Sequence, residues 1–232
     1  MDLQKPVSRD EWLEARKALL LREKALTKAR DELSALRREM PLCQVEKTYN
    51  FQSEEGRETL RQLFGPHRQL IIYHFMFGPN WHEGCPSCSF WADGFEGIDV
   101  HLAARDTAFV CVSNAPLDKL LAYRARLGWR FKWVSAADTG FSPDFAVSFH
   151  DGDQSLSATG YNYSGTFSAD ELPGVSVFIR DGETVFHSYS TYSRGLDMLN
   201  GAYHFLDLTP LGRQEEDLDW SMAWLKRRDA YD

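Results

Sequence analysis

The sequence predicts an α/β domain in which parallel strands alternate with helices and the sheet closes with an antiparallel hairpin. Three observations lead to this fold class. The runs LIIYHFMF (residues 70–77) and TAFVCVS (residues 107–113) are apolar almost without alternation, which is typical of strands buried on both faces of a parallel sheet. A helical spacing of apolar residues separates them, which implies a right-handed crossover. The segment VSVFIRDGETVFHSYS (residues 175–190) has two strand-like runs around Asp181-Gly182, a strong hairpin signal.

Length and composition fit one sizeable soluble domain with appendages. The chain has 232 residues, of which 43% are hydrophobic and 13% aromatic, and a chain of this size buries roughly 70% of its unfolded surface. The longest apolar run, residues 70–77, is too short to span a bilayer. The start, MDLQKPVSRDEW, lacks the basic and apolar regions of a secretory signal. We therefore expect a cytoplasmic protein with no membrane partner.

Charge and cysteine usage narrow the function classes. The net charge of −8 argues against nucleic acid as a partner, because proteins that bind nucleic acid concentrate Lys and Arg on one face. Four cysteines do not make a disulfide framework in a chain of this size. In a cytosolic protein a C-x-x-C pair is more often catalytic or metal-binding than a structural bridge. These features favour thiol or metal chemistry.

Residues 9–40 have the clearest helical pattern and form the predicted N-terminal arm, residues 1–41. Pro41 ends the helix, and Ser8 or Asp10 is the expected N-cap. Two interpretations stay open: the helix lies on its own domain through one narrow apolar stripe, or it is an arm that forms a homodimer. The stripe consists of residues at a seven-residue period, namely Trp12, Leu19, Leu26, Leu33 and Met40.

Residues 42–210 carry the predicted main domain. Residues 49–64 predict a short strand, a turn at Glu55-Gly56 and a short helix that ends at Gly65-Pro66, and the buried strand at 70–77 follows. The next helical pattern extends over residues 86 to 105.

In that helix Gly94 and Gly97 each cost about 1 kcal/mol relative to Ala and favour a bend. After the strand at 107–113, a helix is expected over residues 116–127 and a third parallel strand over residues 131–135.

Residues 137–172 read as a loop-rich insertion, with one helical turn or short strand expected over Asp144–Phe149. After the hairpin, the pattern predicts a helix over residues 195–205 and an acidic C-terminal tail over residues 211–232. The insertion separates the parallel part of the sheet from the hairpin.

The stretch GPNWHEGCPSCSFW (residues 78–91) follows the first buried strand and contains Cys85 and Cys88. If the strand ends near Gly78 and a helix begins at Pro86, then Cys85 is the N-cap and Pro86 takes the first helical position, where its missing N–H removes no bond. Unpaired backbone N–H groups stabilise a thiolate there and lower its pKa to roughly 3.5–7.5. Cys88, one turn into the helix, is within disulfide reach. The spacing predicts Cys85 as the nucleophile and Cys88 as the resolving thiol.

Two other interpretations of the cysteines remain open. In the first, both thiols are ordinary core residues, because free cysteine is among the most buried residue types. In the second, they bind zinc together with His82. A closed zinc site takes four ligands, usually in two pairs, and Cys43 and Cys111 stand alone, so we expect no metal and no other cofactor. The non-enzymatic alternative is a metal-stabilised or redox-inert interaction module that dimerises through the N-terminal helix.

The text around the cysteines resembles the thioredoxin superfamily. The pattern strand, W-x-x-x-C-x-x-C, helix places Trp81 four residues before Cys85, and VSVFIRDGETVF resembles the closing hairpin of that fold. The order of the segments is similar to the peroxiredoxin-like branch. More closely, the sequence resembles a large family of thioredoxin-like proteins labelled predicted dithiol-disulfide oxidoreductases. This resemblance covers nearly the whole chain and rests on EWLEARKALL, YHFMFGPNW, GCPSCSFWAD, HLAARD, GWRFKWVS and STYSRGLDMLNGAYHFLDLTP.

The resemblance implies a thiol-disulfide oxidoreductase that acts on a protein or small-molecule disulfide or thiol and is recycled by an unidentified reductase. It also implies a cis-proline beside the dithiol, just ahead of the hairpin, where the backbone docks substrate. Pro173 is the candidate, and the alternative is that it is a trans proline that ends the loop. Peroxiredoxins carry Thr or Ser three residues before the peroxidatic cysteine, where this chain has His82. The alternative enzyme is a peroxiredoxin-like thiol peroxidase, in which Cys85 is oxidised to a sulfenate that condenses with Cys88.

Overall fold

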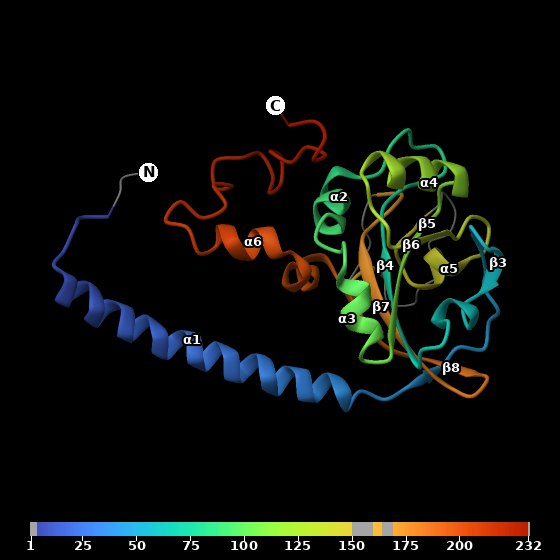
Figure 1. The fold of residues 1–232 in the computed structure, drawn as a ribbon, viewed down its shortest axis with the longest axis horizontal. Coiled ribbons are helices and arrows are strands. Elements are labelled where there is room, and N and C mark those ends of the chain that lie inside the picture. Colours follow the sequence, from blue (N-terminus) through green and yellow to red (C-terminus); the bar gives the residue numbers. More distant parts are fainter. Residues whose placement is uncertain (1–3, 150–159, 164–168, 232) are drawn as a thin grey trace.

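The computed structural model describes residues 4–149, 160–163 and 169–231. These residues form one eight-stranded sheet in the order β1-β8-β7-β4-β5-β6-β2-β3 (Figure 1). At its centre β4 (Gln69–His74) pairs in parallel with β5 (Thr107–Ser113), with Gln69 opposite Thr107 and His74 opposite Val112. The two apolar runs of the sequence are therefore neighbouring parallel strands, as predicted.

The sheet continues in parallel on one side of this pair and in antiparallel on the other. β6 (Lys132–Ser135) pairs in parallel with β5. β7 (Gly174–Asp181) pairs antiparallel with β4, and β8 (Thr184–Tyr192) pairs antiparallel with β7. Gly182 in the connecting turn has φ 55°, the left-handed region that glycine tolerates. The predicted fold class, parallel strands with an antiparallel closing hairpin and flanking helices, is confirmed.

Three short strands extend the sheet at its edges. β1 (Cys43–Gln44) pairs with β8, and β2 (Asn50–Ser53) pairs with β6. The chain then turns at Glu55-Gly56 as predicted, but it continues as β3 (Gly56–Thr59), antiparallel to β2. Only a short 3-10 helix, η1 (Gln62–Phe64), follows. This is the short helix predicted to end at Gly65-Pro66, and Gly65 is its C-cap. The sequence did not predict β3, which forms because Gly56, at φ 107°, reverses the chain so that it pairs with β2.

The helix predicted over residues 86–105 is interrupted. The structure has two helices there, α2 (Pro86–Ala92) and α3 (Ile98–Ala103). Gly97 has φ 81° and is the N-cap of α3. A residue in this left-handed region cannot lie inside a right-handed helix, so one continuous helix cannot pass through Gly97, and a second helix starts after it. α4 (Leu117–Arg126) agrees with the helix predicted over residues 116–127.

The loop-rich insertion contains little regular structure where the structure describes it. α5 (Phe141–Asp144) is a single helical turn that lies earlier than the predicted Asp144–Phe149, and Ser148 and Glu171 form an isolated bridge. The parts of the predicted insertion at residues 150–159 and 164–168 lie outside the described residues.

The helix predicted over residues 195–205 is also divided, into the 3-10 helix η2 (Ser193–Leu199) and α6 (Gly201–Leu206). Asn200 between them has φ −102° and ψ 98°, which is extended backbone. Its side-chain Oδ1 accepts a hydrogen bond from the N–H of Tyr203 at 3.0 Å and so caps α6. The cap explains why the helical pattern restarts here.

α1 (Arg9–Arg38) begins at a capping box in which the Ser8 side chain and backbone exchange hydrogen bonds with Glu11. The helix buries none of its residues; Trp12 is 45% exposed and Leu26 62%. Figure 1 shows α1 running away from the sheet. The interpretation of α1 as a helix packed on its own domain is therefore wrong, whereas dimerisation stays a prediction. Among the described residues, no helix is both long and apolar enough to cross a membrane.

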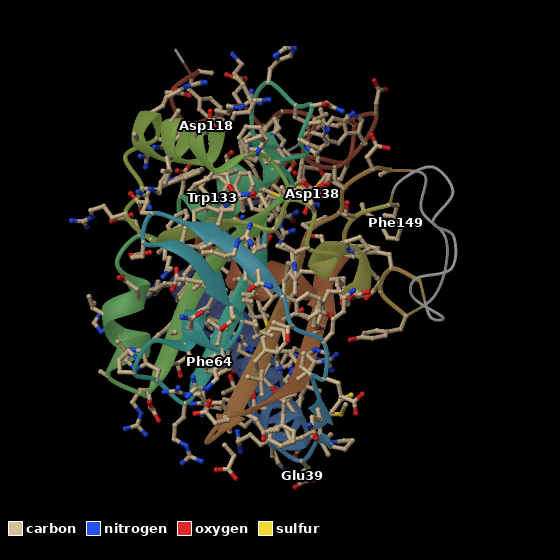
Figure 2. The ribbon with its side chains drawn as sticks, turned by 90° about the vertical axis from the view of Figure 1, so that its right-hand side faces the viewer. Glu39, Phe64, Asp118, Trp133, Asp138 and Phe149 are labelled. Carbon is tan, nitrogen blue, oxygen red and sulfur yellow. The ribbon has the colours of Figure 1, made fainter. Side chains whose placement is uncertain are left out.

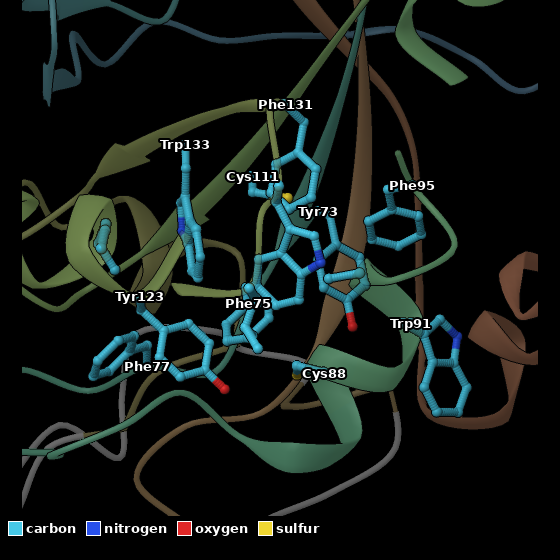
Figure 3. Close-up of a cluster of buried hydrophobic side chains, with 14 of the residues drawn as sticks. Tyr73, Phe75, Phe77, Cys88, Trp91, Phe95, Cys111, Tyr123, Phe131 and Trp133 are labelled. Carbon is cyan, nitrogen blue, oxygen red and sulfur yellow. The ribbon is translucent and has the colours of Figure 1, made fainter. Parts of the chain in front are cut away.

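Two aromatic-rich clusters fill the space on either side of the central strands. Successive side chains of a strand point to opposite faces, so Tyr73 and Phe75 enter one cluster and Ile72 enters the other. The first cluster lies under α2 and α4 and contains Cys88 and Trp133 (Figure 3). In Figure 2, Trp133 lies in the body of the domain, between Asp118 on α4 and Glu39 at the end of α1. The first cluster supports the two cysteines.

Candidate redox site

The chain leaves β4 at His74 and reaches Cys85 through a loop that folds back on the strand end. The N–H of Cys85 donates to the carbonyl of Met76 at 3.0 Å, and the N–H of Ser89 donates to the carbonyl of Cys85 at 3.0 Å. Cys85 has φ −57° and ψ 132° and is the N-cap of α2, with Pro86 in the first turn. The predicted placement of Cys85 at the helix start is confirmed.

Gly84 lets the loop approach the core closely at this point. A Cβ atom at this position would lie 2.7 Å from the ring of Phe75 and 3.0 Å from that of Tyr123. Real Cβ atoms do not approach other heavy atoms so closely, and both rings are buried. Only glycine allows the chain to enter α2 at this depth, which fixes the position of Cys85 relative to the aromatic cluster.

The environment of Cys85 stabilises its thiolate. A hydrogen bond from the Cys88 side chain is the largest cause, followed by backbone hydrogen bonds from Cys88 and Ser87, and together they outweigh the opposing effect of burial. These interactions lower the pKa of Cys85 to about 6. Cys85 is partly exposed. It is therefore a partly accessible thiol that is largely ionised at neutral pH.

Cys88 has the opposite environment. Its side chain is 2% exposed, and burial raises its pKa well above the usual value, as does its interaction with Cys85. Its Sγ accepts a hydrogen bond from the N–H of Met76 at 3.5 Å, and the Tyr73 hydroxyl is a second partner. Figure 3 shows Cys88 at the edge of the cluster that contains Tyr73 and Phe75. Both cysteines are free thiols in this structure.

Of the other predicted site residues near the dithiol, Trp81 packs on the core and His82 does not lie buried with it. Trp81 is partly buried and packs against the first cluster together with Cys85. His82 is exposed. Within the described part of the chain, no group of three or more His, Cys, Asp and Glu side chains is arranged to hold a metal ion. The alternative zinc set of Cys85, Cys88 and His82 is accordingly not assembled here.

Pro173 lies at the same end of the sheet as the dithiol. It directly precedes Gly174, which pairs with His74 at the end of β4. No peptide bond among the described residues is cis, so the bond before Pro173 is trans and the cis-proline implied by the resemblance is not found there. The carbonyl of Pro173 accepts a hydrogen bond from the Tyr161 hydroxyl at 2.8 Å, and the charge of Cys88 contributes to the raised pKa of Tyr161. Tyr161 is therefore close enough to the dithiol to interact with it electrostatically.

Three further residues near Cys85 were not predicted from the sequence. Tyr73 contacts the buried thiol, Tyr123 contacts the loop before Cys85, and Arg227 in the C-terminal tail donates to the carbonyl of Gly84 at 2.7 Å. Nothing in the local sequence marks Arg227, because its partner lies 143 residues away. For Tyr73 the only available signal was its position near the end of the strand that leads to the dithiol.

A family model described as "Bacterial protein of unknown function (DUF899)" matches residues 1–231. The chain belongs to this family. The match includes α1 and the C-terminal tail. No curated protein matches the chain.

Solved structures with a similar fold include peroxidoxin BcpB from Mycobacterium tuberculosis, at 14% identity and a TM-score of 0.45, covering 69% of this chain and 92% of that one. A Cys-to-Ser mutant of PrxQ from Xylella fastidiosa has 12% identity and a TM-score of 0.42, covering 68% and 89%. A secreted Mycobacterium tuberculosis disulfide oxidoreductase homologous to Escherichia coli DsbE has 15% identity and a TM-score of 0.38, covering 66% and 92%. At these identities the likeness concerns the fold alone.

Proposed function

We propose that the protein is a thiol-disulfide oxidoreductase in which Cys85 is the nucleophile and Cys88 the resolving thiol. The observation that carries this proposal is the contrast between two thiols one helical turn apart. Cys85 is partly exposed with a pKa lowered to about 6, whereas Cys88 is buried with a raised pKa. Two core thiols without a redox role would both be buried and protonated. The contrast suits a pair in which one thiol attacks the substrate and the other stays protonated until the mixed disulfide has formed.

The reaction follows from these properties. The Cys85 thiolate attacks one sulfur of a disulfide substrate, so that a mixed disulfide forms and the other substrate sulfur leaves as a thiolate. Cys88 then gives its proton to the thiolate released in the first step and attacks the Sγ of Cys85, which releases the second substrate thiolate. The substrate gains two electrons, and the protein is left with a Cys85–Cys88 disulfide. Burial and the nearby Cys85 thiolate keep Cys88 protonated before the first step. Once Cys85 is part of the mixed disulfide it carries no charge and no longer opposes the ionisation of Cys88.

The proposed substrates are a protein or small-molecule disulfide, or a thiol if the reaction runs in the oxidising direction. The sulfur pair carries both electrons, so the exchange itself takes no cofactor. Return of the disulfide to the dithiol takes a thiol reductant, which in the cytoplasm is a separate reductase or a low-molecular-weight thiol. The backbone beside Pro173, at the same end of the sheet, is the proposed docking edge for the substrate.

The test is the pH dependence of alkylation at Cys85, followed by mass spectrometry in the Cys43→Ser variant. This variant lacks the exposed thiol of Cys43, which would otherwise react as well. We expect a midpoint near pH 6. With oxidised glutathione, Cys88→Ser is expected to accumulate one glutathione on Cys85, whereas the parent protein forms the internal disulfide. Cys85→Ser is the matched control and is expected to take up none.

A midpoint near the free-cysteine pKa of about 8.5, together with no internal disulfide, would contradict the proposed activity. The peroxidase alternative makes a different prediction in the same variants. If it is correct, dilute peroxide produces a sulfenate on Cys85 in Cys88→Ser at a rate well above that of an ordinary thiolate. We expect only the slow background reaction, because exposed His82 stands where peroxiredoxins carry a hydroxyl side chain.

A further inference from the structure

The last described residues of the chain return to the loop that precedes the dithiol. We call residues 207–231 the C-terminal segment. Within it, Arg227 donates two hydrogen bonds to the carbonyl of Gly84, from Nη2 at 2.7 Å and from Nε at 3.2 Å. Its Nη1 also forms an ion pair with Glu83 at 2.8 Å. One guanidinium therefore holds the two residues that lie directly before Cys85.

The same guanidinium reaches the first turn of α2 through two hydroxyl groups. Its Nε donates to the Tyr123 hydroxyl at 2.9 Å, which shares a hydrogen bond of 2.8 Å with Oγ of Ser89. Ser89 in turn donates to the carbonyl of Cys85 at 2.8 Å. Tyr123 and Ser89 are both buried, and water competes little for buried hydrogen bonds. These hydrogen bonds hold the carbonyl of Gly84, before Cys85, and the carbonyl of Cys85 itself.

Charge gives Arg227 a second effect on the site. Glu83 lies two residues before Cys85, and its pKa is lowered by a hydrogen bond from Arg126 and by the charge of Arg227, so it is ionised at neutral pH. An unpaired carboxylate at this distance along the chain would repel a thiolate. The two arginines that pair with Glu83 remove this repulsion.

The C-terminal segment is held in place by contacts that do not involve Arg227. Asp229 accepts a hydrogen bond from Arg126 of α4 at 2.6 Å. The ring of Trp224 packs against Phe90 of α2 at 5.7 Å, and its Nε1 donates to Glu215 at 2.7 Å. Arg227 is thus presented to the loop by an ordered segment, and its replacement leaves these anchors intact.

We propose that Arg227 is a positioning residue of the dithiol and that the C-terminal segment is an integral part of the redox site. This inference rests on the proposed function. By holding Gly84 and the first turn of α2, Arg227 keeps the N–H groups of Ser87 and Cys88 directed at the Cys85 sulfur. By pairing with Glu83, it also keeps negative charge away from that sulfur. The segment thereby couples the end of the chain to the reactivity of a thiol in its middle.

The test is the alkylation midpoint of Cys85 in Arg227→Ala, measured in the Cys43→Ser background. Arg227→Ala releases Gly84 and removes one of the two arginine partners of Glu83, and both changes disfavour the Cys85 thiolate. We therefore expect the midpoint to rise from near pH 6 to about pH 7. At pH 7 this change lowers the stabilisation of the reduced form about fivefold, and the equilibrium with glutathione moves toward the disulfide by the same factor.

Arg228→Ala is the matched control, because Arg228 is the next residue and forms an ion pair with Asp93 at the end of α2, away from Cys85. We expect no change in the midpoint. Arg227→Lys, which keeps the charge, is expected to restore at least half of the shift. Should Arg227→Ala fail to fold, Arg227→Gln carries the same test with the same expected direction.

A low midpoint in the parent protein that Arg227→Ala or Arg227→Gln leaves unchanged would overturn the role of Arg227 alone. A midpoint in the parent protein near that of free cysteine would instead overturn the proposed function, and the role of Arg227 with it. The circular dichroism spectrum of each variant shows whether it is folded. The two failures are therefore distinguishable from the same set of measurements.

Discussion

Replacing Cys85 by Ser tests the electrostatics of the site through the stability of the reduced protein. The pKa of Cys85 is about 6 in the folded state and about 8.5 in an unfolded chain. Because folding lowers the pKa, ionisation of this thiol favours the folded state. The contribution is complete above pH 8.5 and is lost as the pH falls through about 6. A shift of roughly 2.5 units corresponds to at most about 3.4 kcal/mol at high pH.

The titration of Cys85 in the folded protein and in the unfolded chain predicts that the free energy of unfolding rises by about 2 kcal/mol between pH 5.5 and 8. The assay is urea unfolding of the parent protein and of Cys85→Ser at both pH values, with a phosphine reductant that keeps the thiols reduced. The difference in the free energy of unfolding between the two proteins is compared across pH, so that other titrating groups cancel. The raised pKa of Cys88 acts mainly above this range, since a buried thiol stays protonated in it.

We expect the parent protein to gain about 2 kcal/mol relative to Cys85→Ser as the pH rises from 5.5 to 8. A difference that is the same at both pH values would refute the reasoning, because the folded structure would then give the thiolate no net stabilisation. A difference of opposite sign would mean that burial outweighs the hydrogen bonds from Cys88 and Ser87.

Three further predictions concern other parts of the molecule. The pKa of buried Glu171 is raised to about 7, mainly by burial. Its contribution to stability is therefore present below about pH 4.3 and is lost as the pH rises through 7. In urea unfolding, the parent protein should lose up to about 3 kcal/mol over this range relative to Glu171→Gln. Gly84→Ala places a Cβ 2.7 Å from Phe75 and should lower the free energy of unfolding by about 1–3 kcal/mol. An unchanged melting temperature would contradict the close packing at this position. Homodimerisation through α1 predicts that Leu19→Ser with Leu26→Ser halves the mass seen by sedimentation without lowering the melting temperature of the domain, because α1 buries no residue; a monomeric parent protein would rule this out.

Local sequence determined much of the fold and the centre of the site. The unbroken apolar runs identify β4 and β5 as buried neighbours, since a parallel strand has no face in water. The Cys-Pro junction places Cys85 at the N-cap, because proline is favoured at the first helical position, where its missing N–H removes no hydrogen bond. Ser8 and Glu11 likewise form the capping box of α1. Each of these inferences depends on interactions within a few residues.

Tertiary structure decided what depends on residues far apart in the chain. The period of the apolar residues after Cys88 continues through Gly97, but the backbone there turns to a positive φ and divides the helix. Burial in the aromatic cluster and the neighbouring Cys85 raise the pKa of Cys88, whereas hydrogen bonds from Cys88 and Ser87 lower the pKa of Cys85. Arg227 reaches Gly84 only because the C-terminal segment folds back across α2. Sequence periodicity reports which face of an element is buried, whereas the partner on that face is chosen by the packing of the whole chain.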